Sequence, residues 1–275
     1  TESATPNSGF DSIHSSVSLT LPSNIEELVL TSAFARSGFG NSLNNTIVGS
    51  FGANTLDGGL GADALYGGPG NDVYYVDHTG DQTIELAAQG RDEVIASISW
   101  TLQDHVEDLV LQPAADASGH ALNLDGTGNL LSNEIIGTAG DNRLSDGGGG
   151  FDLLKGGYGN DTYVISTSSA RIYEGFDAGT DTVQSLISYT LGGHLEQLEL
   201  LGSDSIDGAG NHLDNQLTGN SGDNELDGKR GIDTMAGGDG DDVYHVDDVL
   251  DVVTELVSGG DADRIVATVS YSLPS

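Results

Sequence analysis

The sequence predicts an all-β solenoid, a fold in which short strands and tight turns repeat along one axis. The first observation is the stretch Gly58–Tyr75, which contains two consecutive copies of a nine-residue unit, G-G-x-G-x-D followed by three residues. The second is a longer repeat of about 80 to 90 residues that contains such units. The third is the alternation of apolar and polar residues in short segments, the period of a half-buried strand. Self-similarity at a fixed period favours a solenoid over one irregular globule.

Each place in the nine-residue unit has a physical role. Glycines at places one, two and four permit left-handed and tightly turned backbone, so that carbonyl oxygens can face a common point. The aspartate at place six adds an anionic oxygen, and oxygen ligands of these kinds suit a hard divalent cation such as calcium. An apolar residue at place eight is expected to point inward, because alternate residues of a strand face opposite sides. We interpret the unit as a cation-binding turn followed by a three-residue strand.

These units occur in three blocks, at residues 40–75, 128–164 and 210–245, and the middle block has one extra residue around Asp146. The residues at place six are Asn45, Asn54, Asp63, Asp72, Asn133, Asn142, Asp152, Asp161, Asn215, Asn224, Asp233 and Asp242. The residues at place eight, predicted to form the core, are Ile47, Leu56, Leu65, Tyr74, Ile135, Leu144, Leu154, Tyr163, Leu217, Leu226, Met235 and Tyr244.

The longer repeat connects the blocks. Four similar strand-like phrases carry an aspartate near their start, at Asp11, Asp92, Asp181 and Asp263. The first three are followed by a second strand-like phrase, IEELVL, VEDLVL or LEQLEL. We therefore predict one continuous solenoid with a partial repeat at residues 1–23 and modules at residues 24–104, 105–193 and 194–275. The phrase LPS at residues 21–23 returns at residues 273–275, which indicates a run of modules from a longer array.

The chain is strongly acidic. Its 8 Lys and Arg residues are outnumbered by 43 Asp and Glu residues, and the formal net charge is −35. This charge excludes nucleic acid and an anionic membrane surface as partners. With 41 glycines it would also favour disorder, because self-repulsion and chain entropy oppose compaction. Bound divalent cations reverse this balance, so we expect folding and metal binding to be one coupled event.

The composition also limits the cofactor and the compartment. The chain has no cysteine, which excludes disulfides and thiolate metal sites and leaves calcium as the available cross-link. No apolar run approaches the ~20 residues that span a bilayer, and no basic segment followed by an apolar one resembles a signal peptide. Extracellular calcium modules bind with a Kd of about 10⁻⁴ to 10⁻³ M and would be empty in the cytosol. We therefore expect a secreted or cell-surface protein.

The blocks resemble the RTX family (repeats in toxin, hemolysin type) of secreted bacterial proteins, whose nonapeptide has the same glycines and aspartate. The resemblance covers most of the chain, strictly in the nonapeptides and loosely between them. It implies a right-handed parallel β-roll in which two nonapeptides make one turn and several calcium ions lie between turns. It also implies export by a type I secretion system.

The resemblance further implies a set of metal ligands, because each calcium of the family lies between loops two nonapeptides apart. The implied pairs are Asn45 with Asp63, Asn54 with Asp72, Asp63 with Asp81, Asn142 with Asp161, Asn224 with Asp242, and Asp233 with Asp251. The implied side-chain ligands are Asn54, Asp63, Asp72, Asp81, Asn142, Asp152, Asp161, Asn224, Asp233, Asp242 and Asp251. The implied backbone carbonyl ligands are those of Gly58, Gly59, Gly61, Gly67, Gly68, Gly70, Gly147, Gly148, Gly150, Gly156, Gly157, Gly159, Gly228, Lys229, Gly231, Gly237, Gly238 and Gly240.

Some loops depart from the family pattern. An asparagine at place six is neutral and offers one oxygen, which weakens a calcium site relative to an aspartate. Lys229 can ligate through its carbonyl, but its positive charge should lower the affinity of its loop. The first loop of each block has leucine where the family has glycine at place four and is expected to turn differently; these residues are Leu43, Leu131 and Leu213.

The middle block lacks one carboxylate. Nine residues after the last nonapeptide aspartate, the first and third blocks have Asp81 and Asp251, whereas the middle block has Ala170. Asp152 therefore loses the partner that the family pattern implies. We expect the middle block to bind calcium more weakly than the other two.

Three further sets of residues recur between modules. Glu85, Glu174 and Glu255 each precede a module aspartate by seven or eight residues. A general acid and base is one interpretation of such a pair, but threefold repetition favours a structural role or a further calcium ligand, since catalysis is normally built once.

Two histidines and a set of large side chains complete the recurrent features. His105 and His194 occupy a place held by Asn24 in the first module, which indicates a turn and not a zinc site. Four residues share one register and are interpreted as a stacked column along the solenoid, with a sugar-binding aromatic strip as the alternative. They are Leu19, Trp100, Tyr189 and Tyr271.

The sequence is compatible with three classes of function. The favoured one is a calcium-binding structural module of a large secreted bacterial protein, which folds on calcium outside the cell, assists export and packs against neighbouring repeats. The alternative is a module of an adhesin or polysaccharide-modifying enzyme that binds a polysaccharide or a cell surface. An enzyme in its own right is disfavoured, because the sequence has no unrepeated nucleophile, base or cofactor motif.

Overall fold

The computed structural model describes residues 9–34, 36–113, 119, 121–176, 178–255 and 262–272. These residues contain 28 short strands, and among them there is no helix long and apolar enough to cross a membrane. Residues 1–8 of the predicted partial repeat and the second LPS phrase at residues 273–275 lie outside the described residues.

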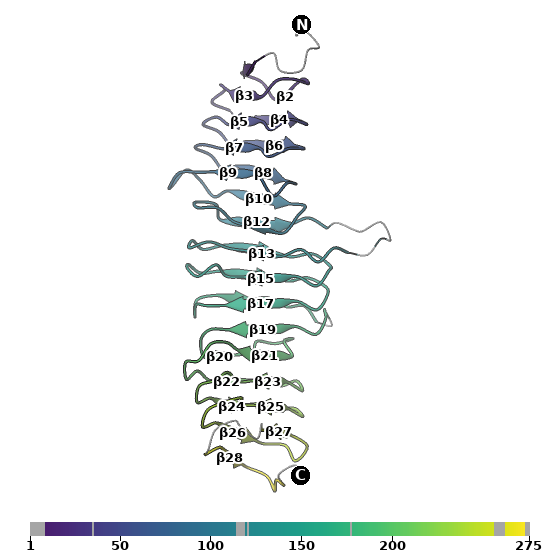
Figure 1. The fold of residues 1–275 in the computed structure, drawn as a ribbon, viewed down its shortest axis with the longest axis vertical. Helices are drawn as coiled ribbons and strands as arrows, with labels where there is room; N and C mark the ends of the chain where they lie inside the picture. The colour runs from purple at the N-terminus through teal and green to yellow at the C-terminus, as the bar shows by residue number, and fades with distance from the viewer. Residues whose placement is uncertain are drawn as a thin grey trace.

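The strands form a parallel β-solenoid that places one strand on each of two faces in every turn (Figure 1). The odd-numbered strands form one face and the even-numbered strands the other, because β1 pairs with β3 and β2 with β4, and so on along the chain. The predicted all-β solenoid is confirmed.

The two faces are built from strands of two to five residues. The odd face consists of β1 (Ser12–Ser15), β3 (Glu27–Leu30), β5 (Thr46–Val48), β7 (Ala64–Tyr66), β9 (Gln82–Ile84), β11 (Trp100–Thr101), β13 (Gly126–Thr127), β15 (Arg143–Ser145), β17 (Thr162–Ile165), β19 (Thr182–Ser185), β21 (Gln197–Leu200), β23 (Gln216–Thr218), β25 (Thr234–Ala236) and β27 (Val252–Thr254). The even face consists of β2 (Leu19–Thr20), β4 (Ser37–Asn41), β6 (Thr55–Gly59), β8 (Val73–Val76), β10 (Glu93–Ala96), β12 (Asp108–Leu111), β14 (Glu134–Ile136), β16 (Leu153–Lys155), β18 (Arg171–Ile172), β20 (Tyr189–Thr190), β22 (Gly208–Ala209), β24 (Glu225–Asp227), β26 (Val243–Val246) and β28 (Arg264–Ala267).

The core is a narrow column of side chains between the two faces. All twelve residues predicted at place eight are completely buried, as their alternation in three-residue strands requires. Register stacks each on its equivalent one turn away, for example Ile47 on Leu65 and Leu56 on Tyr74. The inward assignment made from the sequence is therefore confirmed.

The first and second modules contribute nine strands each, β3–β11 and β12–β20, so successive modules present equivalent strands on opposite faces. The equivalent strands β1, β10, β19 and β28 alternate between the odd and the even face. Nine strands at two per turn make four and a half turns, and the half turn reverses the face each time.

This reversal contradicts the predicted column of large side chains. Leu19 and Tyr189 lie on the even face, whereas Trp100 lies on the odd face. The hydroxyl of Tyr271 accepts a hydrogen bond from the amide of Val253 in β27, also on the odd face. The four residues therefore form no single column. A single column would require a whole number of turns per module, whereas nine strands make four and a half.

The recurrent histidines are turn residues, as predicted. Asn24, His105 and His194 have φ angles of 67°, 69° and 65°, in the left-handed region that tight turns use. Each lies in the turn that leads to the second strand-like phrase of its module, before β3, β12 and β21 respectively.

The core column generates a stability prediction. Truncating the fully buried Leu65 to alanine should cost about 2 to 5 kcal/mol through lost burial and a residual cavity. Because folding is coupled to calcium, Leu65→Ala should raise the calcium concentration at the folding midpoint. Fluorescence of Trp100, the single tryptophan, reports the first module and measures this midpoint.

Two variants act as controls for that measurement. Ala64 precedes Leu65 in β7 and is only half-buried, so Ala64→Ser should leave the midpoint nearly unchanged. Leu226→Ala, in the third module, should also have little effect on Trp100, since a solenoid couples mainly to nearest neighbours. Equal midpoints for Leu65→Ala and Ala64→Ser would contradict the core assignment.

Candidate metal centres

The nonapeptide loops lie along the two edges of the solenoid, where the chain passes from one face to the other. Gly59 and Gly61 have φ angles of 76° and 131°, which only glycine adopts without strain. Lys229 adopts the same left-handed conformation at place two of its loop, with φ 63°. A Cβ added to Gly40 would lie 2.0 Å from the carbonyl oxygen of Gly58. The place-one glycine thus allows a predicted carbonyl ligand to approach the loop of the preceding turn.

The aspartates form ladders that join one turn to the next. Oδ1 of Asp63 accepts a hydrogen bond from the amide of Asn45, and Oδ1 of Asp72 accepts one from Asn54, both at 2.6 Å. The amide of Asp63 in turn donates to Oδ1 of Asp81 at 3.0 Å. The structure likewise brings together the other pairs implied by the resemblance: Asn142 with Asp161, Asn224 with Asp242, and Asp233 with Asp251.

The second carboxylate oxygen of each nonapeptide aspartate is buried without a hydrogen-bond partner. The aspartates are at most 1% exposed, and their Oδ2 atoms have no donor. The residues are Asp63, Asp72, Asp152, Asp161, Asp233 and Asp242. Desolvation by burial raises the pKa of these carboxyl groups from 3.8 to about 6, and that of Asp161 to about 7. An anionic oxygen that is buried and unpaired suits a hard cation.

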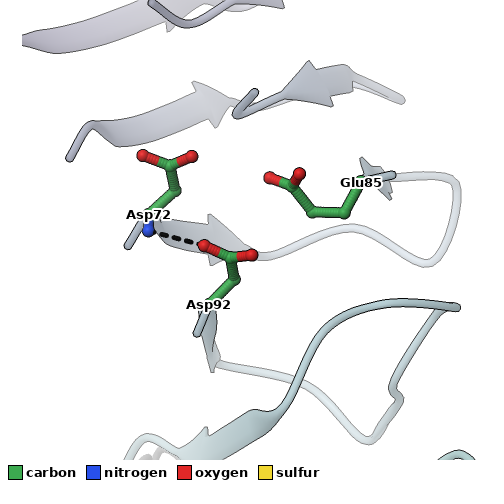
Figure 2. A group of neighbouring side chains, drawn as sticks. All are labelled: Asp72, Glu85 and Asp92. Atoms are coloured by element: carbon green, nitrogen blue, oxygen red, sulfur yellow. Dashed lines mark hydrogen bonds between the residues drawn. The ribbon is translucent and has the colours of Figure 1, made fainter. Parts of the chain in front are cut away.

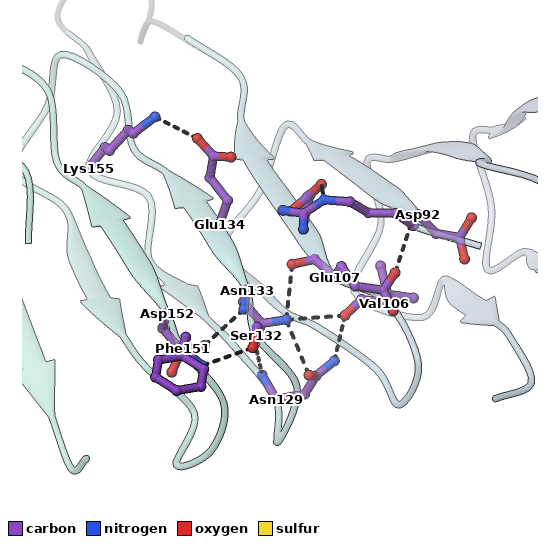
Figure 3. Close-up of polar contacts among 12 residues, drawn as sticks. Asp92, Val106, Glu107, Asn129, Ser132, Asn133, Glu134, Phe151, Asp152 and Lys155 are labelled. Atoms are coloured by element: carbon purple, nitrogen blue, oxygen red, sulfur yellow. Dashed lines mark hydrogen bonds and ion pairs between the residues drawn. The ribbon is translucent and has the colours of Figure 1, made fainter. Parts of the chain in front are cut away.

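The asparagines at place six are satisfied differently. Oδ1 of Asn133 accepts the amide of Asn129 in its own loop at 2.7 Å (Figure 3). Its Nδ2 donates to the carbonyl of Glu107 in the preceding turn at 3.0 Å, and its backbone amide donates to Asp152 at 2.9 Å. Asn54, Asn142 and Asn224, which the resemblance implies as ligands, use their side-chain amides in the same way. A neutral amide thus joins two turns where aspartate leaves an unpaired oxygen.

The middle block has Ala170 where the first block has Asp81, and a different aspartate takes over part of the role of Asp81. Oδ2 of Asp81 accepts the amides of Asp77 and His78 and so closes the turn after β8. The equivalent turn after β17 is closed by Asp146, whose Oδ2 accepts the amides of Ser166 and Thr167 at 2.7 and 3.0 Å. Asp146 is the extra residue that interrupts the nonapeptide register. Asp146 supports the turn but does not replace the second role of Asp81. Oδ1 of Asp81 accepts a hydrogen bond from the amide of Asp63, and Asp146 makes no such bond to the amide of Asp152.

Sequence reasoning missed the last step of each ladder. The amide of Asp72 donates to Oδ1 of Asp92 at 2.7 Å, and the amide of Asp161 donates to Asp181 at 2.8 Å. In the third module Asp242 donates to Asp263 at 2.9 Å. These steps span 20 or 21 residues, not 18, so a search at nonapeptide spacing does not reach them. The signal was present in the longer repeat, whose phrases all carry these aspartates.

Comparison with known proteins agrees with this geometry. The family model of the RTX calcium-binding nonapeptide repeat matches four times, at residues 39–74, 127–149, 136–164 and 218–252. Over 85 residues the chain is 35% identical to the endo-1,3-1,4-beta-glycanase ExsH of Rhizobium meliloti (strain 1021). That similarity covers 31% of this chain and 18% of the length of the glycanase.

The raised pKa values predict opposite effects of pH with and without calcium. A folded-state pKa of about 6 exceeds the ordinary 3.8, so these carboxyl groups stabilise the metal-free fold when protonated and lose that contribution as pH rises through 6. Metal-free protein should therefore gain β signal in circular dichroism as pH falls from 7.5 to 5. The calcium midpoint should rise over the same interval, because protons compete for the ligands. A metal-free spectrum that is independent of pH in this range would contradict the assignment.

The role of Asp146 can be tested by removing its carboxylate. Asp146→Ala leaves the amides of Ser166 and Thr167 without their acceptor and should destabilise the calcium-saturated protein by about 1 to 3 kcal/mol. Urea unfolding at saturating calcium measures this change. Asp104→Ala removes an exposed carboxylate and should have little effect. Equal stability of the two variants would show that Asp146 does not support the turn.

Proposed function

Because this chain contains four copies of the RTX calcium-binding nonapeptide repeat, we propose that it is a calcium-dependent structural module of a larger secreted bacterial protein. The observation that carries the proposal is the series of buried aspartate oxygens without partners, in a chain of net charge −35. Calcium, when bound, supplies the positive charge that these oxygens need and links adjacent turns. No catalytic role is assigned to the carboxylates, since each cluster recurs in three modules.

The residues proposed to hold calcium are those of the loops and ladders. The aspartates contribute their unpaired oxygens, and the loop carbonyls of places one, two and four contribute the neutral ligands that the resemblance implies. Each residue at place six forms one rung of a ladder between turns. The neutral asparagine rungs hold adjacent turns together with their own hydrogen bonds. We therefore propose that the aspartate rungs are the sites that depend most on calcium.

The acidic composition accounts for a role in export. In a calcium-poor cytosol, repulsion among carboxylates keeps the chain extended, as passage through a type I secretion channel requires. At extracellular calcium concentrations near 10⁻³ M, sites with a Kd of about 10⁻⁴ to 10⁻³ M fill and the solenoid forms. The folded module then acts as a rigid spacer between other parts of the parent protein.

Circular dichroism tests this proposal directly. At neutral pH in excess chelator and low salt, the chain should give the spectrum of a disordered polypeptide. Millimolar calcium should produce a β spectrum, whereas the same concentration of sodium should not. A full β spectrum in excess chelator would overturn the proposal.

A carbohydrate-binding module is the second candidate, and one observation favours it. A shallow cleft of about 290 Å³ next to a calcium loop is lined by Leu30, Val48, Phe51 and Tyr66, and Phe51 is 79% exposed. The similar segment of a 1,3-1,4-beta-glycanase suggests β-glucan as the probe. Trp100 is only 8% exposed and would not report binding at the surface. Calorimetry should therefore be used, and heat that is lost in Phe51→Ala would favour this candidate.

A further inference from the structure

Each nonapeptide block ends in a cluster of three carboxylates that come from three separate segments of the chain. In the first module Asp72 and Asp92 precede β8 and β10 on one edge, and Glu85 follows β9 (Figure 2). One carboxylate oxygen from each of the three residues lies within 4.8 Å of the others. The equivalent clusters are Asp161, Glu174 and Asp181 in the second module, and Asp242, Glu255 and Asp263 in the third.

The strand register shows how Glu85 reaches this position. Tyr66 of β7 pairs with Ile84 of β9, so Glu85 lies one turn beyond Gly67, at the place that glycine occupies in a nonapeptide loop. A Cβ on Gly67 would lie within 2.4 Å of three oxygens, from Tyr74, Glu85 and Asp72. The glycine thus leaves the room into which the glutamate side chain of the next turn extends.

The glutamate is held by a tyrosine of the core. The hydroxyl of Tyr74 donates a hydrogen bond to Oε1 of Glu85, and the same contact joins Tyr163 to Glu174 and Tyr244 to Glu255. The spacing between tyrosine and glutamate is 11 residues in all three modules. Each tyrosine is the last core residue of its block, so the motif recurs where the nonapeptides end.

The remaining oxygens of the first cluster have no donor. Asp72, Glu85 and Asp92 are 1%, 6% and 1% exposed, and Oδ2, Oε2 and Oδ2 respectively are buried and unpaired. The nearest basic residue in sequence, Arg91, forms its ion pair with Asp108 at 2.6 Å. Burial raises the pKa of Glu85 to about 7 and that of Asp92 to about 6. Three buried carboxyl groups without a counter-charge are costly unless they bind a cation or protons.

The other two clusters differ in their surroundings. In the second module Asp161, Glu174 and Asp181 are at most 8% exposed, and Oδ2 of Asp161 is unpaired. In the third module Glu255 and Asp263 are exposed. The inference therefore rests on the first two clusters, and the first carries it furthest.

We propose that Asp72, Glu85 and Asp92 form a calcium site that closes the block, in which Glu85 and Asp92, both outside the nonapeptide pattern, join Asp72 of the last loop. The Asp161, Glu174 and Asp181 cluster is its equivalent in the second module. Three anionic oxygens on separate segments suit calcium, which accepts irregular oxygen coordination. Tyr74 is a positioning residue that orients Glu85. The inference rests on the proposed calcium-dependent function and adds to it a site that the nonapeptide pattern does not contain.

A crystal of the wild-type chain grown with calcium gives the first test. Anomalous difference density should show a calcium peak bounded by Asp72, Glu85 and Asp92, and a second bounded by the equivalent residues of the second module. Peaks at the loops without peaks at these clusters would overturn the inference while leaving the proposed function intact. A chain that folds without any bound calcium would overturn the proposed function itself.

Equilibrium dialysis with Glu85→Gln gives the second test. This variant keeps the size of the side chain and removes its charge, and it should bind one calcium ion fewer than the wild type at saturation. Glu93→Gln is the matched control, because it makes the same charge change at the partly exposed first position of β10. The charges that act on Glu93 are those of Asp108 and Glu134 and not those of the cluster, so its stoichiometry should be unchanged. An unchanged stoichiometry and affinity in Glu85→Gln would overturn the inference. If this variant does not fold, the wild-type anomalous map decides.

The role of Tyr74 is tested separately. Tyr74→Phe keeps all three carboxylates but removes the hydrogen bond to Glu85. Loss of such an outer contact typically weakens metal binding about 10- to 100-fold. The affinity of one site should fall within this range in calcium titrations, with the total number of ions unchanged. An affinity equal to that of the wild type would exclude the positioning role.

Discussion

The structure depends on one contact, the hydrogen bond from a backbone amide to the aspartate carboxylate of the following turn. The bond fixes the distance between turns and places the carboxylate inside the edge of the solenoid, where Asp63 and Asp72 are 1% exposed. It uses one oxygen and leaves the other buried. The contact that stacks the turns therefore also buries a negative charge that a cation must balance. A chain of net charge −35 has few positive side chains that could do so.

Within each block, the need for a bound cation increases from the first loop to the last. Each block begins with two asparagine rungs, whose side-chain amides bridge to the preceding turn, and continues with two aspartate rungs. It then ends at a cluster of three carboxylates with a tyrosine-bound glutamate. Neutral hydrogen bonds thus hold the start of a block, and the dependence on cations grows toward its end. The backbone of the loops changes in step: the aspartate loops have positive φ at places two and four, as at Gly59 and Gly61, whereas the asparagine loops, all of them among the described residues, have none.

The odd number of strands per module distributes the charge. Because nine strands make a half-integer number of turns, the carboxylate cluster of the second module lies on the edge opposite to those of the first and third. Clusters of like charge are thereby separated across the solenoid as well as along it, which reduces their mutual repulsion. The half turn does not interrupt the apolar core, because the strands of both faces bury the same kinds of apolar residue.

The sequence alone determined the class of fold, the inward column from Ile47 to Tyr244, and the turns at His105 and His194. The inward column follows from a local rule, because a period of two selects the buried side. The pairing of Asn45 with Asp63 and its equivalents came from the resemblance to the RTX family, in which two nonapeptides make one turn. Only the tertiary structure decided three other features. It extended the ladders to Asp92 and Asp181 across steps of 20 residues, it placed Glu85 beside them, and it put Trp100 and Tyr189 on opposite faces. Each of these features depends on which strands lie one turn apart where residues are inserted between the nonapeptides. Strand pairing in space fixes that, and the local sequence pattern does not.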